Sequence, residues 1–105
     1  MTVNNSQVAL PAPELYATMT GAQVLIGELL YNPTIIIFDN FAAVSVTVYI
    51  GAVQWKTFAA GEALVLDMRA AHGLAANYTF SVGTKIYGVG ASGDFSVSYL
   101  YAKSS

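Results

Sequence analysis

The chain has 105 residues, enough for one domain, and it contains no cysteine. Hydrophobic residues make up 55% of it and charged residues only 10%, against about 25% charged in an ordinary globular domain. The formal net charge is −2 and the four Lys and Arg residues are scattered, which argues against nucleic-acid binding because phosphate neutralisation needs a basic patch. We therefore expect a small domain that buries its excess apolar surface against other subunits.

Neither a membrane span nor a secretory signal is expected. The best uncharged run, residues 40–55, is shorter than the about 20 apolar residues of a spanning helix, and its centre alternates Val with Ser and Thr. The first ten residues contain no basic residue followed by an apolar core, as a signal peptide would.

Residues 1–14 form a distinct segment that is polar at first and then carries Pro11 and Pro13. Alternate prolines favour an extended backbone and disfavour a helix. This segment is either a frayed terminus or an arm that lies across a neighbouring subunit. We expect the remainder, residues 15–105, to be a single domain that begins with weak helical or irregular character over residues 15–21.

From residue 23 onward the pattern predicts β-structure. Residues 23–32 suit a strand pair or one strand kinked around Gly27, and the β-branched run 34–38 predicts a buried strand. Residues 44–50 alternate apolar and polar side chains, which is the strand period. A tight turn at Gly51-Ala52 then leads into a strand over residues 53–58.

The second half continues in the same way. We expect a turn at residues 60–62, strands over 63–68, 78–82, 84–87 and 95–101, a loop at 70–76 and a glycine-rich connection at 88–94. About seven or eight short antiparallel strands without long helices indicate an all-β fold, a small sandwich or barrel.

The sequence contains no convincing set of catalytic or cofactor-binding residues. Residues 88–93 match G-x-G-x-x-G, but a dinucleotide site needs a helix to begin inside the motif, and here a strand follows. His72 is the only histidine, close to Asp67 and Arg69, and a triad with Ser81 or Ser92 has no nucleophile elbow to support it. The acids are spread along the chain as turn and edge residues. We predict no catalytic residue, no metal site and no cofactor.

The aromatic residues of the strands are more informative. Tyr49, Trp55, Tyr87, Tyr99 and Tyr101 all lie on expected strands. They can fill the core, anchor a subunit interface, where Tyr and Trp are enriched, or form a flat platform that stacks on sugar rings. We predict the interface at Pro11, Pro13, Tyr49, Trp55, Tyr99 and Tyr101.

Three stretches resemble small β-sandwich structural proteins of tailed bacteriophages: VSVTVYIGAVQW (44–55), GEALVLDMRA (61–70) and GTKIYGVGASGDFSVSYLYA (83–102). The glycine-rich turn and the final Ser-Val-Ser-Tyr strand look like those of capsid decoration, or cement, proteins and of head or tail-fibre domains. The resemblance covers about two thirds of the chain. It implies a jelly-roll-like subunit without catalytic residues.

From this resemblance we expect a structural virion protein on the outer capsid surface. It would form a homotrimer, bind the major capsid protein and stabilise capsomer junctions, with residues 1–14 as the arm that reaches a neighbour. The alternative is a carbohydrate-binding or receptor-binding module of a head or tail fibre, which would use Trp55 and the tyrosines.

Overall fold

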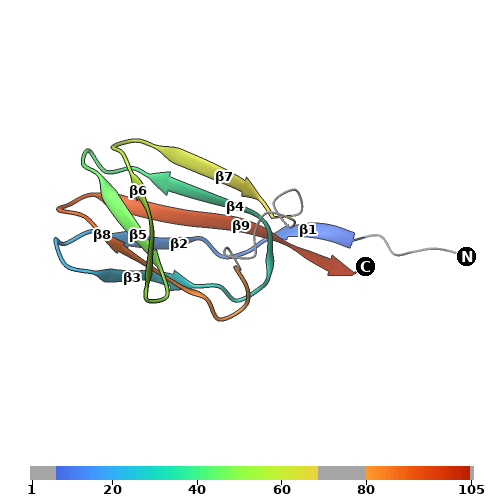
Figure 1. The fold of residues 1–105 in the computed structure, drawn as a ribbon. Coiled ribbons are helices and arrows are strands. Elements are labelled where there is room, and N and C mark those ends of the chain that lie inside the picture. The colour runs from blue at the N-terminus through green and yellow to red at the C-terminus, as the bar shows by residue number, and fades with distance from the viewer. Residues whose placement is uncertain (1–6, 69–79, 105) are drawn as a thin grey trace, which may run out of the picture.

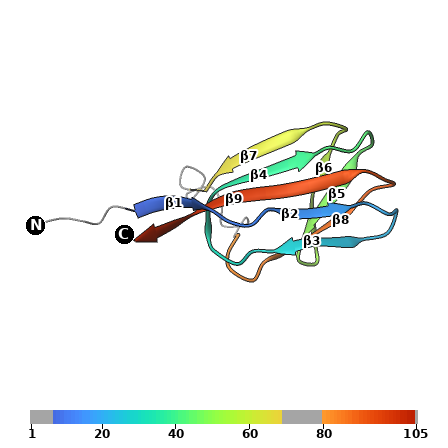
Figure 2. The ribbon, with the colours of Figure 1, turned by 180° about the vertical axis from the view of Figure 1, so that it is seen from behind.

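The computed structural model describes residues 7–68 and 80–104, in which every regular element is a β-strand. No helix in these ranges is long and apolar enough to cross a membrane. The strands form two antiparallel sheets that pack face to face (Figures 1 and 2). They are β1 (Gln7–Pro11), β2 (Leu15–Thr18), β3 (Val24–Glu28), β4 (Pro33–Asn40), β5 (Val46–Ile50), β6 (Val53–Phe58), β7 (Ala63–Asp67), β8 (Lys85–Val89) and β9 (Asp94–Ser104).

The strands pair in a nested order: β2 with β9, β3 with β8, β4 with β7, and β5 with β6. Two further pairings, β4 with β9 and β5 with β8, complete sheet A (β1-β9-β4-β7, with β2 also on β9) and sheet B (β3-β8-β5-β6). Because β1 and β2 pair with successive parts of β9, they share one edge position. This is a long antiparallel hairpin wound into two sheets, the jelly-roll arrangement with eight strand positions. The predicted all-β, jelly-roll-like sandwich is confirmed.

The core lies between the sheets and is built from alternate residues of the central strands. On β9, Phe95, Val97 and Tyr99 are at most 3% exposed. On β5, Val46 and Val48 are completely buried, so the apolar face of the predicted alternation lies against the core. The other large members of the core are Met19, Ile26, Leu29, Ile36, Phe38, Phe58, Phe80 and Ile86.

Gly27 lies at the predicted kink of β3. The register against β8 shifts between Leu25 and Gly27, so the strand contains a β-bulge. A Cβ at Gly27 would come within 2.7 Å of the Leu15 side chain, and glycine therefore lets β2 approach β3 at the edge of the sandwich.

Two local predictions were wrong, and a third is confirmed only in part. Residues 15–18 form strand β2 rather than helical or irregular structure, because β9 offers them a free edge. Phe80–Val82 is not a strand: Phe80 enters the core, and a turn follows in which Thr84 N–H donates to Ser81 O at 3.0 Å. The run 34–38 is buried on one face only, since Ile35 and Ile37 point away from the core that Ile36 and Phe38 enter.

Strand β1 and the end of β9 extend beyond the sandwich as a two-stranded ribbon (Figures 1 and 2). β4 pairs with β9 only as far as Tyr101, which lies opposite Pro33, so residues 102–104 pair with β1 alone. Of the predicted N-terminal arm, residues 1–14, residues 7–11 are therefore extended and lie in this ribbon, and residues 12–14 connect β1 to β2. Residues 1–6 lie outside the described residues.

Candidate functional site

The outer face of sheet A carries a row of large apolar side chains. Ile35 and Ile37 project outward from β4, with Leu100 of β9 opposite Ile35 and Val65 of β7 opposite Ile37. Val65 is 59% exposed, and Ile35, Ile37 and Leu100 are half-buried. We call these four residues the sheet A patch. Contiguous apolar surface of this kind usually marks a contact site.

A groove of about 320 Å³ runs beside the sheet A patch. Ile35, Ile37 and Leu100 line it together with Pro11, at the end of β1, and Glu14, in the segment that connects β1 to β2. The predicted interface residue Pro11 therefore borders the patch. Pro13, from the same connection, is exposed.

The rim of the sheet A patch is acidic. Asp39 shares the outward-facing side of β4 with Ile37, and Asp67 lies opposite Ile35 on β7. Among the side chains that the structure describes, no Lys or Arg lies on sheet A, whereas Lys56 and Lys85 lie on β6 and β8 of sheet B. Of the two sheets, only sheet B therefore carries described cationic side chains, and there Glu28 of β3 lies opposite Lys85.

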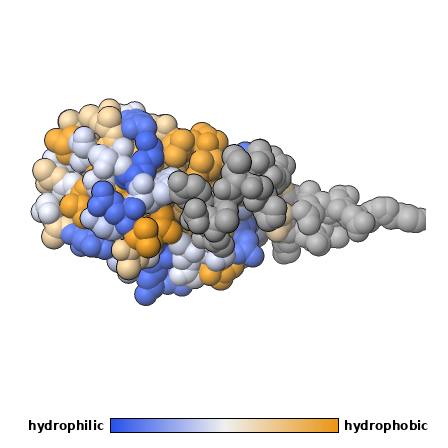
Figure 3. Space-filling view, in the orientation of Figure 1, coloured by the Kyte–Doolittle hydropathy of each residue, from blue (hydrophilic) through white to orange (hydrophobic). Residues whose placement is uncertain are grey.

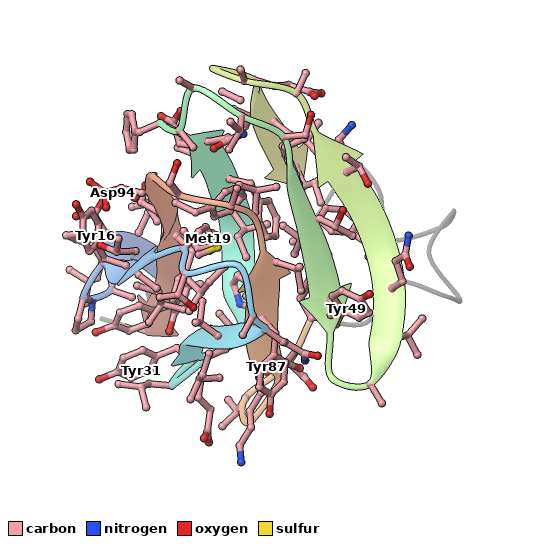
Figure 4. The ribbon with its side chains drawn as sticks, turned by 90° about the vertical axis from the view of Figure 1, so that its left-hand side faces the viewer. Tyr16, Met19, Tyr31, Tyr49, Tyr87 and Asp94 are labelled. Atoms are coloured by element: carbon pink, nitrogen blue, oxygen red, sulfur yellow. The ribbon has the colours of Figure 1, made fainter. Side chains whose placement is uncertain are left out.

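A small polar cluster closes one end of sheet A. The Thr18 hydroxyl donates to Asp94 Oδ1 at 2.7 Å, and the hydroxyl of Tyr16 also bonds this carboxylate. These two hydrogen bonds lower the pKa of Asp94, because they stabilise the ionised carboxylate. Tyr16 is 54% exposed and lies beside Asp94 at the outer edge of the sheet (Figure 4). The cluster fixes the register of β2 on β9.

Trp55 lies in the sandwich rather than on an open surface. Its ring packs 4.9 Å from that of Phe38 and 5.7 Å from that of Phe80, between ring centroids. In β6, Lys56 pairs with Val48 and Gln54 pairs with Tyr49, so Trp55 is the extra residue of a β-bulge. Bulges re-aim side chains, and this one turns the tryptophan toward the core. Trp55 is therefore half-buried against the core.

The two predicted interface tyrosines of β9 differ in position. Tyr99 is only 3% exposed, and its hydroxyl accepts a hydrogen bond from Leu30 N–H at 2.9 Å. Tyr101 stacks on Tyr31, with centroids 3.8 Å apart and ring planes at 5°, where the ribbon leaves the body. Burial raises the pKa of Tyr101, and the Tyr31 hydroxyl adds to this. Tyr101 and Tyr31 are available to a partner, whereas Tyr99 offers almost no surface.

Tyr49 lies on the outer face of sheet B, directly opposite Tyr87 of β8. Tyr87 in turn lies opposite Leu25 of β3, and Tyr49 opposite Gln54 of β6. Figure 4 shows both rings on the side of the sheet away from the core. Sequence reasoning named Tyr49 as an interface residue, but it could not place Tyr87 beside it, because the pairing of β5 with β8 is long-range.

The remaining candidate groups form no constellation in the described residues. The G-x-G-x-x-G motif spans the end of β8 and the crossing from sheet B to sheet A, and strand β9 begins at Asp94 directly after it. No group of three His, Asp or Glu side chains there could hold a metal ion. The predictions at Arg69, His72 and residues 70–76 fall outside the described residues.

Comparison with known proteins gave no match: no family model, no curated protein and no solved structure matches the chain.

Proposed function

We propose that this protein is a structural subunit that works in assembled form, as a decoration protein on the outer surface of a bacteriophage head. The observation that carries the proposal is the sheet A patch, together with the scarcity of charged residues in the chain. The core is already filled by the inward-facing residues of both sheets, so the patch is apolar surface in excess of what the fold needs. Its burial requires a second molecule.

The acidic rim favours three copies over two. In a two-fold contact the same surface meets itself, so the rim of one copy that carries Asp39 would approach the same acidic rim of the other copy. Like charges brought together in an interface are unfavourable. A ring of three joins two different surfaces and avoids this clash. A homotrimer therefore fits the charge distribution better than a dimer.

The terminal ribbon supplies a second contact. An isolated two-stranded ribbon is marginally stable in water, and beyond Tyr101 the β9 strand pairs with β1 alone. The stacked Tyr31 and Tyr101 rings lie at its base. We infer that the ribbon lies against a neighbouring copy or the major capsid protein, where further contacts hold it.

The function is tested with phage particles assembled with and without the protein. Particles that lack it should lose their DNA at a lower temperature, and adding the purified protein back should restore their stability. A variant with Ile37→Lys and Val65→Lys should fold but fail to restore it, while Thr57→Lys, on the opposite sheet, should act like the unmodified protein. Equal heat stability with and without the protein would refute the cement function.

A further inference from the structure

The outer face of sheet B combines aromatic rings with hydrogen-bonding groups. A row of four side chains crosses all its strands in register: Leu25, Tyr87, Tyr49 and Gln54. In the next row, the hydroxyls of Thr47 and Thr57 are 2.9 Å apart. Figure 3, which views this side of the molecule, shows hydrophilic and hydrophobic residues intermixed. The face is thus unlike the sheet A patch, where four apolar side chains adjoin.

A shallow hollow of about 670 Å³ lies on this face, with Gln23 before β3 and the turn at Gly83 and Thr84 before β8 among its lining residues. Tyr87 supplies a ring to its lining, Gln23 an amide, Thr84 a hydroxyl and Lys85 an ammonium group. The hairpin turn at Gly51 and Ala52 forms part of its wall. Tyr87, Lys85 and Thr84 come from one strand and the turn before it, so a regular element holds the principal groups in place.

The turn glycines keep the hollow open. Gly51 and Gly83 both have positive φ, at 62° and 90°, and a Cβ at either position would meet nothing within 4 Å. The turns therefore adopt a left-handed conformation that favours glycine, and they leave room for a ligand to approach the backbone.

The charge of the hollow is positive. Among the described residues that line it, Lys85 is the only charged one and none carries a carboxylate. Within the described part of the chain the structure shows an ion pair for Lys56, with Glu62 at 3.0 Å, but none for Lys85. Glu28 lies opposite Lys85 on β3 without lining the hollow.

These groups match the chemistry of one ligand class. A sugar ring presents a C–H face that packs on an aromatic ring, and hydroxyl groups that bond to amides and hydroxyls. A lysine ammonium adds a charge-assisted hydrogen bond to a carboxylate. We propose that the hollow binds an acidic sugar unit of a surface glycan, with Tyr87 under the ring, Gln23 and Thr84 on its hydroxyls and Lys85 on its carboxylate. This activity is independent of the proposed assembly through sheet A.

Calorimetric titration of the whole protein with paired probes tests the proposal. Sialyllactose and lactose differ by one acidic sugar, and trigalacturonate supplies the same carboxylate chemistry from a uronic acid. At least one acidic probe should bind at least about tenfold more tightly than lactose, because a hydrogen bond to a charged group is worth this much. Its binding should weaken as salt is raised. If no acidic probe binds more tightly than lactose, the proposal is wrong.

Three variants and a control assign the binding to the hollow. Lys85→Gln should remove the preference for the acidic probe. Glu28→Gln should strengthen binding of the acidic probe, because this substitution removes the negative charge opposite Lys85. Tyr87→Ala should abolish binding, with folding checked by thermal unfolding, while Tyr16→Ala on sheet A should bind like the unmodified protein. Binding of the acidic probe that survives Lys85→Gln unchanged would overturn the proposal. All four variants should keep the oligomeric state of the unmodified protein. A failure of the sugar-binding proposal would therefore not affect the proposed assembly function, which the heat stability of the particles tests separately.

Discussion

The side chain of Asn40 at the end of β4 donates from Nδ2 to the carbonyl oxygen of Ala59 at 2.9 Å, and this bond ties sheet A to the turn that follows β6 of sheet B. Asn40 is completely buried. Its Nδ2 also lies 3.0 Å from Val44 O, and its Oδ1 accepts from Ala42 N–H at 2.9 Å. One amide thus organises two connections that cross between the sheets.

Asn40→Ala should destabilise the fold by about 3 kcal/mol, because it leaves buried backbone groups without partners. Asn32→Ala is the matched control, since the Asn32 side chain accepts a single exposed hydrogen bond from Val82 N–H, and its cost should stay below about 1 kcal/mol. Urea unfolding followed by tryptophan fluorescence measures both. Equal costs would contradict the role given to Asn40.

Gly93→Ala should be more harmful than the same change at another left-handed glycine. Gly93 has φ 88°, and its new Cβ would collide with Ala42, 2.7 Å from the Cα of that residue. Gly61 has φ 74°, but a Cβ there would meet nothing within 4 Å. Gly61→Ala should therefore lower the free energy of unfolding by about 1 kcal/mol, the cost of placing alanine in a left-handed conformation. Gly93→Ala should lower it by at least about 3 kcal/mol. Thermal unfolding should show the difference, and similar melting temperatures would argue against the close contact.

Stability should fall in acid through Asp94. Its pKa is lowered in the folded protein by the hydrogen bonds from Tyr16 and Thr18. A lowered pKa means that the stabilisation is complete above the unfolded value of 3.8 and is lost as the pH falls through the folded value. Asp94→Asn should therefore flatten the pH dependence of unfolding below 3.8.

The Lys56–Glu62 pair supplies the comparison for Asp94. The pKa of Glu62 is also lowered, first by its bond from Ala59 N–H and then by Lys56. Glu62→Gln should remove a separate part of the loss of stability in acid. The double variant, with Asp94→Asn and Glu62→Gln, should remove both parts. Unchanged pH dependence in Asp94→Asn would show that its hydrogen bonds do not stabilise the carboxylate.

The sequence allowed prediction of those features that depend on neighbouring residues. Alternation along β5 and β9 places Val46 with Val48, and Phe95 with Val97, on one face of each strand, and in the structure that face lies against the core. Alternation could not show that Ile35 and Ile37 face outward, because the apolar residues of β4 follow one another without polar residues between them. Their outward position is what reveals the sheet A patch.

Long-range pairing and local irregularity explain the other differences. Whether Trp55 faces the core or the surface could not be predicted, because one extra residue in β6 changes which side a side chain faces and a bulge leaves no mark in this sequence. The pairing of Tyr49 with Tyr87 joins distant segments through β5 and β8. Residues 15–18 became a strand because β9 was available as a partner, which no local propensity reports.

The mass of the purified protein in solution, measured by light scattering at micromolar concentration, tests the central claim most directly. The account predicts the mass of a trimer for the unmodified protein. It predicts that the double variant Ile37→Lys, Val65→Lys gives folded single chains, while Thr57→Lys leaves the trimer intact. A wild-type protein that stays a single folded chain at these concentrations, with the sheet A patch open to water, would contradict it.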